Sequence, residues 1–276
     1  MKILLSLNYR HFKITPNEII SLLKKYDNNN IIKGFEVSIK YDNDLVYLKQ
    51  LAGICKNKGY LLRLHAPTLI NINKYEEYFD FVNKITQIYE DSLNVVFHPI
   101  NAESIEKSIS KTVQYLKHIY EYIEIKRYKR IIISIENLND INGLERIKKE
   151  NIEGILKKFE KLKFTYDIGH ELIDNNSVSN LSDLLLDRLN NIHIHAYDGN
   201  KDHYPILREN EKSIKVLMVL EEIKNKGYND VIVSEYALDY IEGNDFNSKM
   251  INYIRHSIML GDNKIVNGQL KNYLGK

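Results

Sequence analysis

The chain has 276 residues, a hydrophobic fraction of 43% and a formal net charge of +2, from 39 Lys and Arg against 37 Asp and Glu. This length is sufficient for one α/β barrel, and the balanced charge disfavours, without excluding, a nucleic-acid partner. No apolar run approaches the roughly 20 residues that span a bilayer, so no membrane association is expected. The only cysteine, Cys55, rules out a disulfide framework and points to a cytoplasmic protein.

Short apolar segments recur along the chain and alternate with segments of helical periodicity. The expected strands are 2–7, 33–39, 60–65, 93–98, 129–136, 163–168, 191–196 and 230–235. Strands that are apolar throughout suit a parallel sheet covered by helices. We therefore predict an α/β fold with a single (β/α)8 TIM barrel, in which residues 1–276 form one domain. Within it, residues 260–276 are expected to form a short extra helix or a loosely held tail.

Histidine and acidic side chains gather where six of the expected strands end. In chain order the residues at these ends are His65, His98, Glu136, Asp167, His195 and Glu235. Active sites of TIM barrels form at the carboxyl ends of the strands, so these side chains should meet at one mouth of the barrel. Such a set of side chains predicts a metal site.

The third and fourth strands each end in a histidine. His65 lies in the sequence LHAP and His98 in FHP, and a proline follows each histidine closely. Proline turns the chain out of the barrel and fixes the histidine at its rim. Both histidines are candidate metal ligands, although a hydrogen-bonded histidine at the edge of a core is the alternative for each.

Two further strands end in glutamate. Glu136 follows IIISI, and Glu235 follows VIVS. An unpaired carboxylate after such an apolar run would be costly, so each needs a cation or a strong hydrogen-bond network. Metal ligation is the simpler interpretation, and both residues are also candidates for the catalytic acid and base.

The sequence DIGH places Asp167 at a strand end and His170 one turn later. Gly169 is expected to let the backbone turn tightly between them. Both side chains are candidate ligands, and His170 is also a candidate for substrate binding. Capping of the next helix by Asp167 is the alternative.

The seventh strand carries two histidines in the sequence IHIH. Alternation along a strand places His193 and His195 on the same face, at different depths in the barrel. His195 lies nearer the mouth and is the better metal ligand. His193 is expected to pack deeper, or to contact a ligand or the substrate.

The loop DGNKDHYP that follows could fold over the site. His203 is its best candidate ligand, whereas Asp198 and Asp202 are weaker candidates that we assign to substrate binding. Mixed nitrogen and oxygen ligands suit zinc or manganese, with iron as a further option, better than magnesium or calcium. One to three ions are compatible with the number of ligands.

These motifs resemble the xylose isomerase-like TIM barrel superfamily, which includes sugar isomerases and epimerases and the endonuclease IV family of apurinic-site nucleases (AP endonuclease family 2). The similarity runs from LHAP through FHP, IEN, DIGH and HIHAYDG to SEY. In the sugar epimerases one divalent metal is held by two Glu, one Asp and one His. The resemblance assigns these ligands to Glu136, Asp167, His195 and Glu235, with His170 contacting substrate oxygens.

Endonuclease IV enzymes instead hold three zinc ions. The additional ligands implied by that similarity are His65, His98, His170 and His203. The chain departs from the family pattern, because Lys201 stands where an Asp precedes the loop histidine and Asp202 is out of register. Residues 206–209 also replace an expected Leu-Gly-Glu-Gly turn, and Thr68 replaces an aromatic wedge.

Two mechanisms follow from the resemblance. In an isomerase or epimerase, the metal polarises a sugar carbonyl while Glu136 and Glu235 exchange a proton with carbon. In a hydrolase, two or three zinc ions about 3.5–4 Å apart activate water and clamp a phosphoester. The extra histidines favour hydrolysis, whereas the absence of a basic groove disfavours a long nucleic acid.

We therefore expect a divalent-metal-dependent isomerase or epimerase that acts on a small carbohydrate-like substrate, either a sugar or a sugar phosphate, with the hydrolase as the alternative. A non-catalytic barrel that only binds metal or sugar is a third interpretation. The chain could also assemble as a homodimer.

Overall fold

The protein is described from a computed structural model. The described residues are 1–38, 45–67, 74–140, 145–174, 181–198, 201–207 and 210–261. Thr68 and most of the expected tail, residues 262–276, lie outside this part of the chain.

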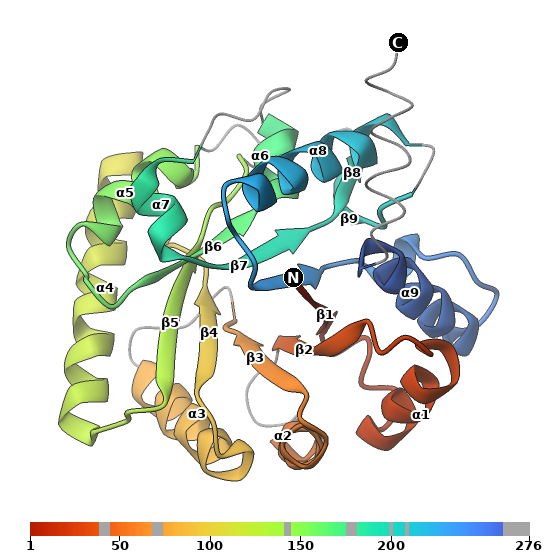
Figure 1. Cartoon of the computed structure of the whole chain (residues 1–276). Coiled ribbons are helices and arrows are strands. Elements are labelled where there is room, and N and C mark those ends of the chain that lie inside the picture. Colours follow the sequence, from red (N-terminus) through yellow and green to blue (C-terminus); the bar gives the residue numbers. More distant parts are fainter. Residues whose placement is uncertain are drawn as a thin grey trace.

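Eight parallel strands close into a barrel in the order β1-β10-β7-β6-β5-β4-β3-β2, which confirms the predicted (β/α)8 TIM barrel (Figure 1). The barrel strands are β1 (Lys2–Leu7), β2 (Ile32–Ser38), β3 (Leu61–His65), β4 (Leu93–Phe97), β5 (Ile131–Glu136), β6 (Lys163–Asp167), β7 (Leu189–Ile194) and β10 (Val231–Ser234). Two shorter strands, β8 (Ala196–Asp198) and β9 (Lys201–Tyr204), pair antiparallel as a hairpin outside the barrel.

Helices surround the barrel and connect its strands (Figure 1). They are α1 (Pro16–Tyr26), α2 (Leu45–Lys58), α3 (Tyr75–Tyr89), α4 (Ile105–Lys126), α5 (Lys149–Leu156), α6 (Ile168–Asp174), α7 (Asp183–Arg188), α8 (Glu211–Asn225) and α9 (Phe246–Gly261), with one 3-10 turn, η2 (Leu238–Tyr240). The local sequence determines where several of these helices begin. Thr15, for example, caps α1 in a reciprocal hydrogen-bonding arrangement with Glu18, and Pro16 occupies the first turn.

The seventh barrel strand differs most from its expected bounds. It was expected over 191–196, but β7 begins at Leu189 and ends at Ile194. A register shift between Phe164 and Thr165 of β6 skips one residue of β7, because Phe164 pairs with Leu189 and Thr165 pairs with Asn191. Such an irregularity is not encoded in apolar periodicity, so the sequence alone could not locate it.

The main apolar core lies between the barrel strands and the surrounding helices. It includes fully buried side chains from strands, such as Phe35 and Phe164, and from helices, such as Phe79 and Ile119. A much smaller apolar cluster contains Leu4, Val231 and Val233, with Leu61 packed against it. These side chains belong to the first three residues of β1, β3 and β10, so the cluster lies toward the amino ends of the strands.

Polar side chains also hydrogen-bond across the barrel strands. Ser134 lies 2.8 Å from the Thr165 hydroxyl and donates to Asn190, whose amide donates to Asn94. Nearer the carboxyl ends, Glu36 accepts a hydrogen bond of 2.8 Å from Asn191. These hydrogen bonds offset part of the cost of burying the polar side chains, although Asn94 Nδ2 and Asn191 Oδ1 are buried without a hydrogen-bond partner.

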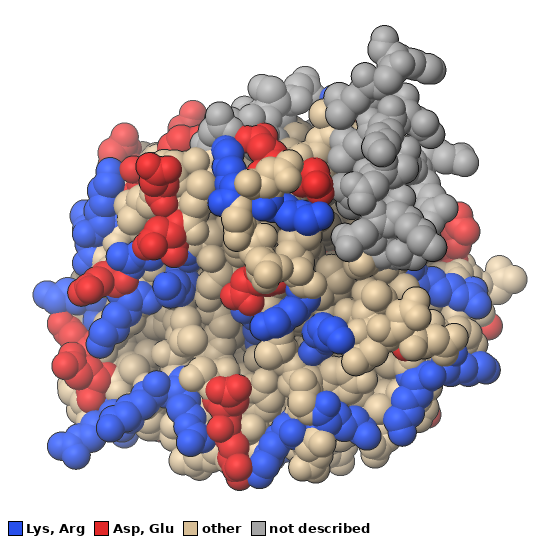
Figure 2. Space-filling model, in the orientation of Figure 1, with Lys and Arg blue, Asp and Glu red and all other residues tan. Residues whose placement is uncertain are grey.

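Basic and acidic side chains are interspersed on the visible surface (Figure 2). Within the part of the chain that the structure describes, no helix is long and apolar enough to cross a membrane. Cys55 is buried in α2, where burial raises the pKa of its thiol to about 12.

Candidate metal centre

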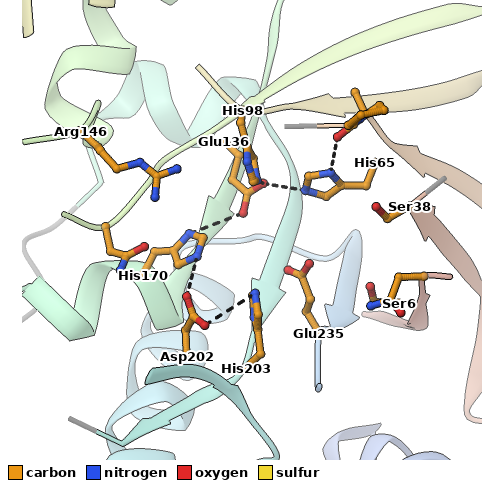
Figure 3. A pocket seen from close by; sticks show the side chains of 14 residues that line it. Ser6, Ser38, His65, His98, Glu136, Arg146, His170, Asp202, His203 and Glu235 are labelled. Carbon is orange, nitrogen blue, oxygen red and sulfur yellow. Dashed lines mark hydrogen bonds and ion pairs between the residues drawn. The ribbon is translucent and has the colours of Figure 1, made fainter. Parts of the chain in front are cut away.

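A pocket of about 380 Å³ opens at the carboxyl ends of the barrel strands (Figure 3). Its described lining consists of Ser6, Asn8, Ser38, His65, Ala66, Pro67, His98, Glu136, Asn139, Arg146, His170, Asp202, His203 and Glu235. Most of the candidate site residues identified in the sequence therefore line one cavity. Asp167, His193 and His195 are fully buried, and their contacts place them against the lining residues.

Two histidines contact one carboxylate oxygen of Glu136, which lies at the end of β5. The Nε2 atoms of His65 and His98 each lie 3.1 Å from Glu136 Oε2. The two imidazole rings meet edge to face, with centroids 4.8 Å apart. Side chains at the ends of β3 and β4 thus converge on the Glu136 carboxylate at the end of β5, as the ligands of a shared cation would.

His193 lies deeper in the barrel, among carboxylates. Its Nδ1 atom is 3.1 Å from Glu136 Oε1 and 3.0 Å from Glu235 Oε2. On the other side of the ring, Nε2 is 2.8 Å from Glu36 Oε1. His193 therefore connects a buried carboxylate of β2 to the two glutamates proposed for catalysis.

A second concentration of imidazole and carboxylate groups surrounds Asp167. His195 Nε2 lies 3.1 Å from Asp167 Oδ1, and His170 Nδ1 lies 3.4 Å from Asp167 Oδ2. Gly169 leaves room for this arrangement, because a Cβ built on it would come within 2.1 Å of the His195 ring. The expected tight turn is not the reason for this glycine, since Gly169 lies in α6 and has no positive φ.

The β8–β9 hairpin brings a further aspartate and histidine to the pocket. Asp202 Oδ2 is 3.8 Å from His170 Nε2, and Asp202 Oδ1 is 4.0 Å from His203 Nε2. His203 has a left-handed backbone with φ of 61°, which is uncommon for a side chain with a Cβ and is often found at functional sites. Asp198 instead lies on the surface, 3.6 Å from Lys212, and does not line the pocket.

Backbone carbonyl groups orient three of the histidines. The Nδ1 atoms of His65 and His195 lie 3.0 Å from the carbonyl oxygens of Ala66 and Ala196, respectively. His195 Nδ1 also lies 3.0 Å from the His203 backbone nitrogen, whose N–H donates to it. His170 Nδ1 lies 3.1 Å from the carbonyl oxygen of Asn137. A histidine that donates through Nδ1 presents the lone pair of Nε2, and this is how metal-binding histidines are usually held.

The neighbouring histidines keep Glu136 and Glu235 ionised. Burial alone would raise the pKa of each carboxyl group, but the charge of His193 and its hydrogen bond more than offset that effect. The pKa of both glutamates therefore lies well below the ordinary value. Ionised carboxylates are the form that binds cations and accepts protons.

The histidines divide into two groups by pKa. Burial opposes protonation of His65 and His195, yet contacts with Glu136 and Asp167, respectively, raise the pKa of each to about 9. Burial lowers the pKa of His98 and His203, and neighbouring histidines reinforce this effect. Positive charge thus lies beside the carboxylates when no cation is present.

Several groups of described side chains could hold a metal ion. The ligand atoms within each group lie within 4.8 Å of one another, and the groups are Glu36, His65 and His193; His65, His98 and Glu136; Asp167, His170 and His195; His170, Asp202 and His203; and Glu136, Asp167, His193 and Glu235. Asp167 Oδ2 is buried and makes no hydrogen bond. A buried acceptor without a hydrogen bond, together with mixed nitrogen and oxygen donors, fits a zinc or manganese ion.

The structure distributes the expected ligands differently from the single four-residue set. Glu136, Asp167 and Glu235 share a group with His193, whereas His195 belongs to a group with Asp167 and His170. Asp202, although out of register in sequence, joins His170 and His203. The assignment of ligands to individual ions therefore stays a prediction.

Several lining residues were not identified from the sequence. Ser6 and Ser38 lie near the ends of β1 and β2, and Asn139 and Arg146 reach the pocket from the segment between β5 and α5. Glu36 was also missed, although a carboxylate within the apolar segment GFEVS was a detectable signal. Nothing in the local sequence marks Arg146, because tertiary structure alone brings it to the cavity.

No protein-family model matches the chain. Two relatives from Methanocaldococcus jannaschii are similar in sequence. The uncharacterized protein MJ1311 is 32% identical over 117 residues, and the match spans 42% of this chain but only 40% of that relative. The uncharacterized protein MJ1614 is 27% identical over 193 residues, which cover 61% of this chain and 72% of the relative.

Solved structures of sugar epimerases have the same fold. A D-tagatose 3-epimerase-like protein aligns with a TM-score of 0.67 and 20% identity, covering 98% of this chain and 100% of its own. D-psicose 3-epimerase from Clostridium cellulolyticum gives 0.61 and 12%, covering 100% and 97%. A Thermus thermophilus protein soaked with ZnCl2 gives 0.59 and 14%, covering 86% and 92%. The chain therefore shares the TIM-barrel fold of these solved structures.

Proposed function

We propose that the protein is a divalent-metal-dependent isomerase or epimerase that acts on a small carbohydrate-like substrate. The supporting observation is that two ionised carboxylates, Glu136 and Glu235, reach one pocket from strands separated by β6 and β7. A pocket of about 380 Å³ lies at the lower end of the range for small-molecule sites. The sugar epimerases among the structural neighbours agree with this choice of substrate.

The metal would be held by Glu136, Asp167 and Glu235 together with His193 or His195. Zinc and manganese suit these donors best, and iron is a further option. When bound, the ion supplies a Lewis acid that polarises a carbonyl group of the substrate. His193 would offer Nδ1, which faces Glu136 and Glu235, while its Nε2 is held by Glu36. His195 would instead offer Nε2, which faces Asp167.

The two glutamates would carry the proton transfer. One carboxylate accepts a proton from the carbon next to the substrate carbonyl and later releases it to solvent. The other first takes up a proton from solvent or from a substrate hydroxyl group and then gives it to carbon. Both are ionised at neutral pH, so either can act as the initial base. His170 and Asp202 line the same pocket and would hydrogen-bond substrate hydroxyl groups.

A multinuclear zinc phosphoesterase is the second candidate. It is favoured by two histidine-rich groups that flank the central carboxylates, namely His65 and His98 with Glu136 on one side, and His170 and His203 with Asp202 on the other. A single-ion epimerase gives these groups no evident metal role. Ions held in all three places would instead clamp a phosphoester and activate water.

Metal content distinguishes the two candidates. Protein purified under gentle conditions is analysed for bound metals, and one tightly held ion per chain supports the epimerase. Two or three zinc ions per chain support the phosphoesterase, and absence of a bound divalent metal would contradict both. His98→Ala adds a second criterion, because it should weaken a cluster hydrolase severely but a single-ion epimerase only mildly.

A further inference from the structure

The pocket lining is chemically different at its two ends. Arg146 approaches from one side, whereas Ser6 and Ser38 lie on the opposite side, with Glu136 and Glu235 between them (Figure 3). Among the described residues that line the pocket, Arg146 is the only lysine or arginine. The two ends would therefore select different substrate groups.

The backbone around Arg146 is fixed on both sides. Its N–H donates to Asp140 Oδ1 at 3.0 Å, and Lys148 Nζ donates to Asp140 Oδ2 at 2.9 Å. Next along the chain, Ile147 is fully buried and its carbonyl accepts from the Leu138 N–H at 3.0 Å. The Arg146 side chain is half-buried, and its backbone is held in place, so binding a ligand requires little ordering of this segment.

Arginine is permanently charged and binds phosphate oxygens through paired N–H donors. Beside it, Asn139 is only 4% exposed, and its Oδ1 atom is buried without a hydrogen-bond partner. This amide oxygen can accept from a hydroxyl group. On the opposite side, Ser6 and Ser38 offer hydroxyl groups. An adjoining cavity that shares Ser6 also includes Arg10, whose charge is paired with Asp239.

From this arrangement we infer that the substrate is a phosphorylated sugar, bound with its phosphate on Arg146 and its hydroxyl chain extended toward Ser6 and Ser38. The reacting carbon atoms then lie between Glu136 and Glu235. This inference rests on the proposed function and names its substrate class. A phosphate would accept charge-assisted hydrogen bonds from the guanidinium, whereas a neutral hydroxyl group would accept weaker ones.

Binding to the manganese-loaded protein tests the inference by calorimetry. The probes are inorganic phosphate and a panel of ketopentose and ketohexose phosphates with the matching free sugars. At least one sugar phosphate should bind about tenfold or more tightly than its free sugar. Arg146→Gln should weaken phosphate binding about tenfold to a hundredfold, and Arg146→Lys should weaken it less.

Lys157→Gln is the matched control, because it removes one positive charge from the exposed end of α5, outside the pocket. It should leave binding unchanged. The inference is overturned if Arg146→Gln binds phosphate as the wild type does, since the metal alone would then hold the anion. It is also overturned if phosphorylated and free sugars bind equally well, or if no phosphorylated probe binds.

Turnover distinguishes this inference from the proposed function. Sugar phosphates that bind through Arg146 but are neither epimerised nor isomerised would contradict the proposed function alone. Epimerisation of free sugars that is insensitive to Arg146→Gln would contradict the phosphate site alone.

Discussion

The two sides of the barrel wall are chemically opposite. The outer side, between strands and helices, is packed with apolar side chains such as Phe35, Phe79 and Phe164. On the inner side, polar side chains form hydrogen-bonded networks. These extend from Ser134 and Thr165 to the carboxylates and histidines at the mouth of the barrel. In many TIM barrels, branched aliphatic residues fill the interior instead.

This contrast suggests a division of roles. Burial of each large apolar side chain stabilises the fold by about 1.5–3 kcal/mol, and most such burial lies outside the barrel wall. The interior polar groups are only partly satisfied by one another, so they contribute specificity of position more than net stability. Changes on the two sides should therefore affect different properties.

The largest effect is expected from Glu136→Gln. The amide cannot accept the proton from carbon and is a poorer metal ligand, so turnover should fall by about 10²–10⁴-fold. Steady-state kinetics and metal analysis provide the measurement, and the thermal unfolding temperature should change little by comparison. Glu121→Gln, on the exposed side of α4, is the control and should leave both properties unchanged. A variant that keeps its activity would exclude Glu136 as the base.

Phe164→Ala tests the other side of the wall. Phe164 is fully buried in the main core, and its truncation should lower the free energy of unfolding by about 3–5 kcal/mol. Chemical denaturation measures the loss. The number of metal ions bound by the folded variant should equal that of the wild type, and a reduced number would show that the two sides are not separable.

Gly169→Ala should act on the site without unfolding the protein. The new methyl group would meet the His195 ring at about 2.1 Å and displace it, so metal affinity should fall about tenfold to a hundredfold. Gly154→Ala is the matched control, because a Cβ at this position in α5 meets no atom within 4 Å. This control should stabilise the protein by about 0.5–1 kcal/mol and leave metal binding intact. Equal metal affinity in the two variants would count against His195 as a ligand.

The smallest expected effect is the release of protons when the protein binds metal. In the metal-free protein the pKa values of His65 and His195 are raised to about 9, so both rings are largely protonated at neutral pH. A ligating histidine must lose its proton, so metal uptake should release protons, and affinity should rise with pH until about 9. Calorimetry in buffers of different ionisation enthalpy measures the release. Uptake without proton release would indicate that neither ring is a ligand.

Much of the fold followed from the sequence because apolar runs and helical periodicity are local signals. The ends of β3 and β5, at His65 and Glu136, fell where the sequence placed them. The closed barrel then implied that residues at these ends converge. Convergence of His65, His98 and Glu136 could thus be anticipated without any knowledge of side-chain contacts.

Other features depend on tertiary geometry. The register shift between Phe164 and Thr165 changes the depth of residues along β7. The sequence therefore could not decide which carboxylates His193 contacts and which His195 contacts. Arg146 reaches the pocket only because the segment before α5 folds back against Leu138. Asp198 was assigned to the site for its sequence proximity to His203, but it lies on the solvent side of the hairpin.

Pairing of β1 with β10 joins segments from opposite ends of the described chain. The Ser234 hydroxyl donates to the Leu4 carbonyl oxygen, 230 positions away, and Glu235 follows directly after the strand that completes the ring. During synthesis, the sheet would therefore keep an open edge at β1 until β10 has been made. The group formed by Glu136, Asp167, His193 and Glu235 would likewise stay incomplete until Glu235 has been made.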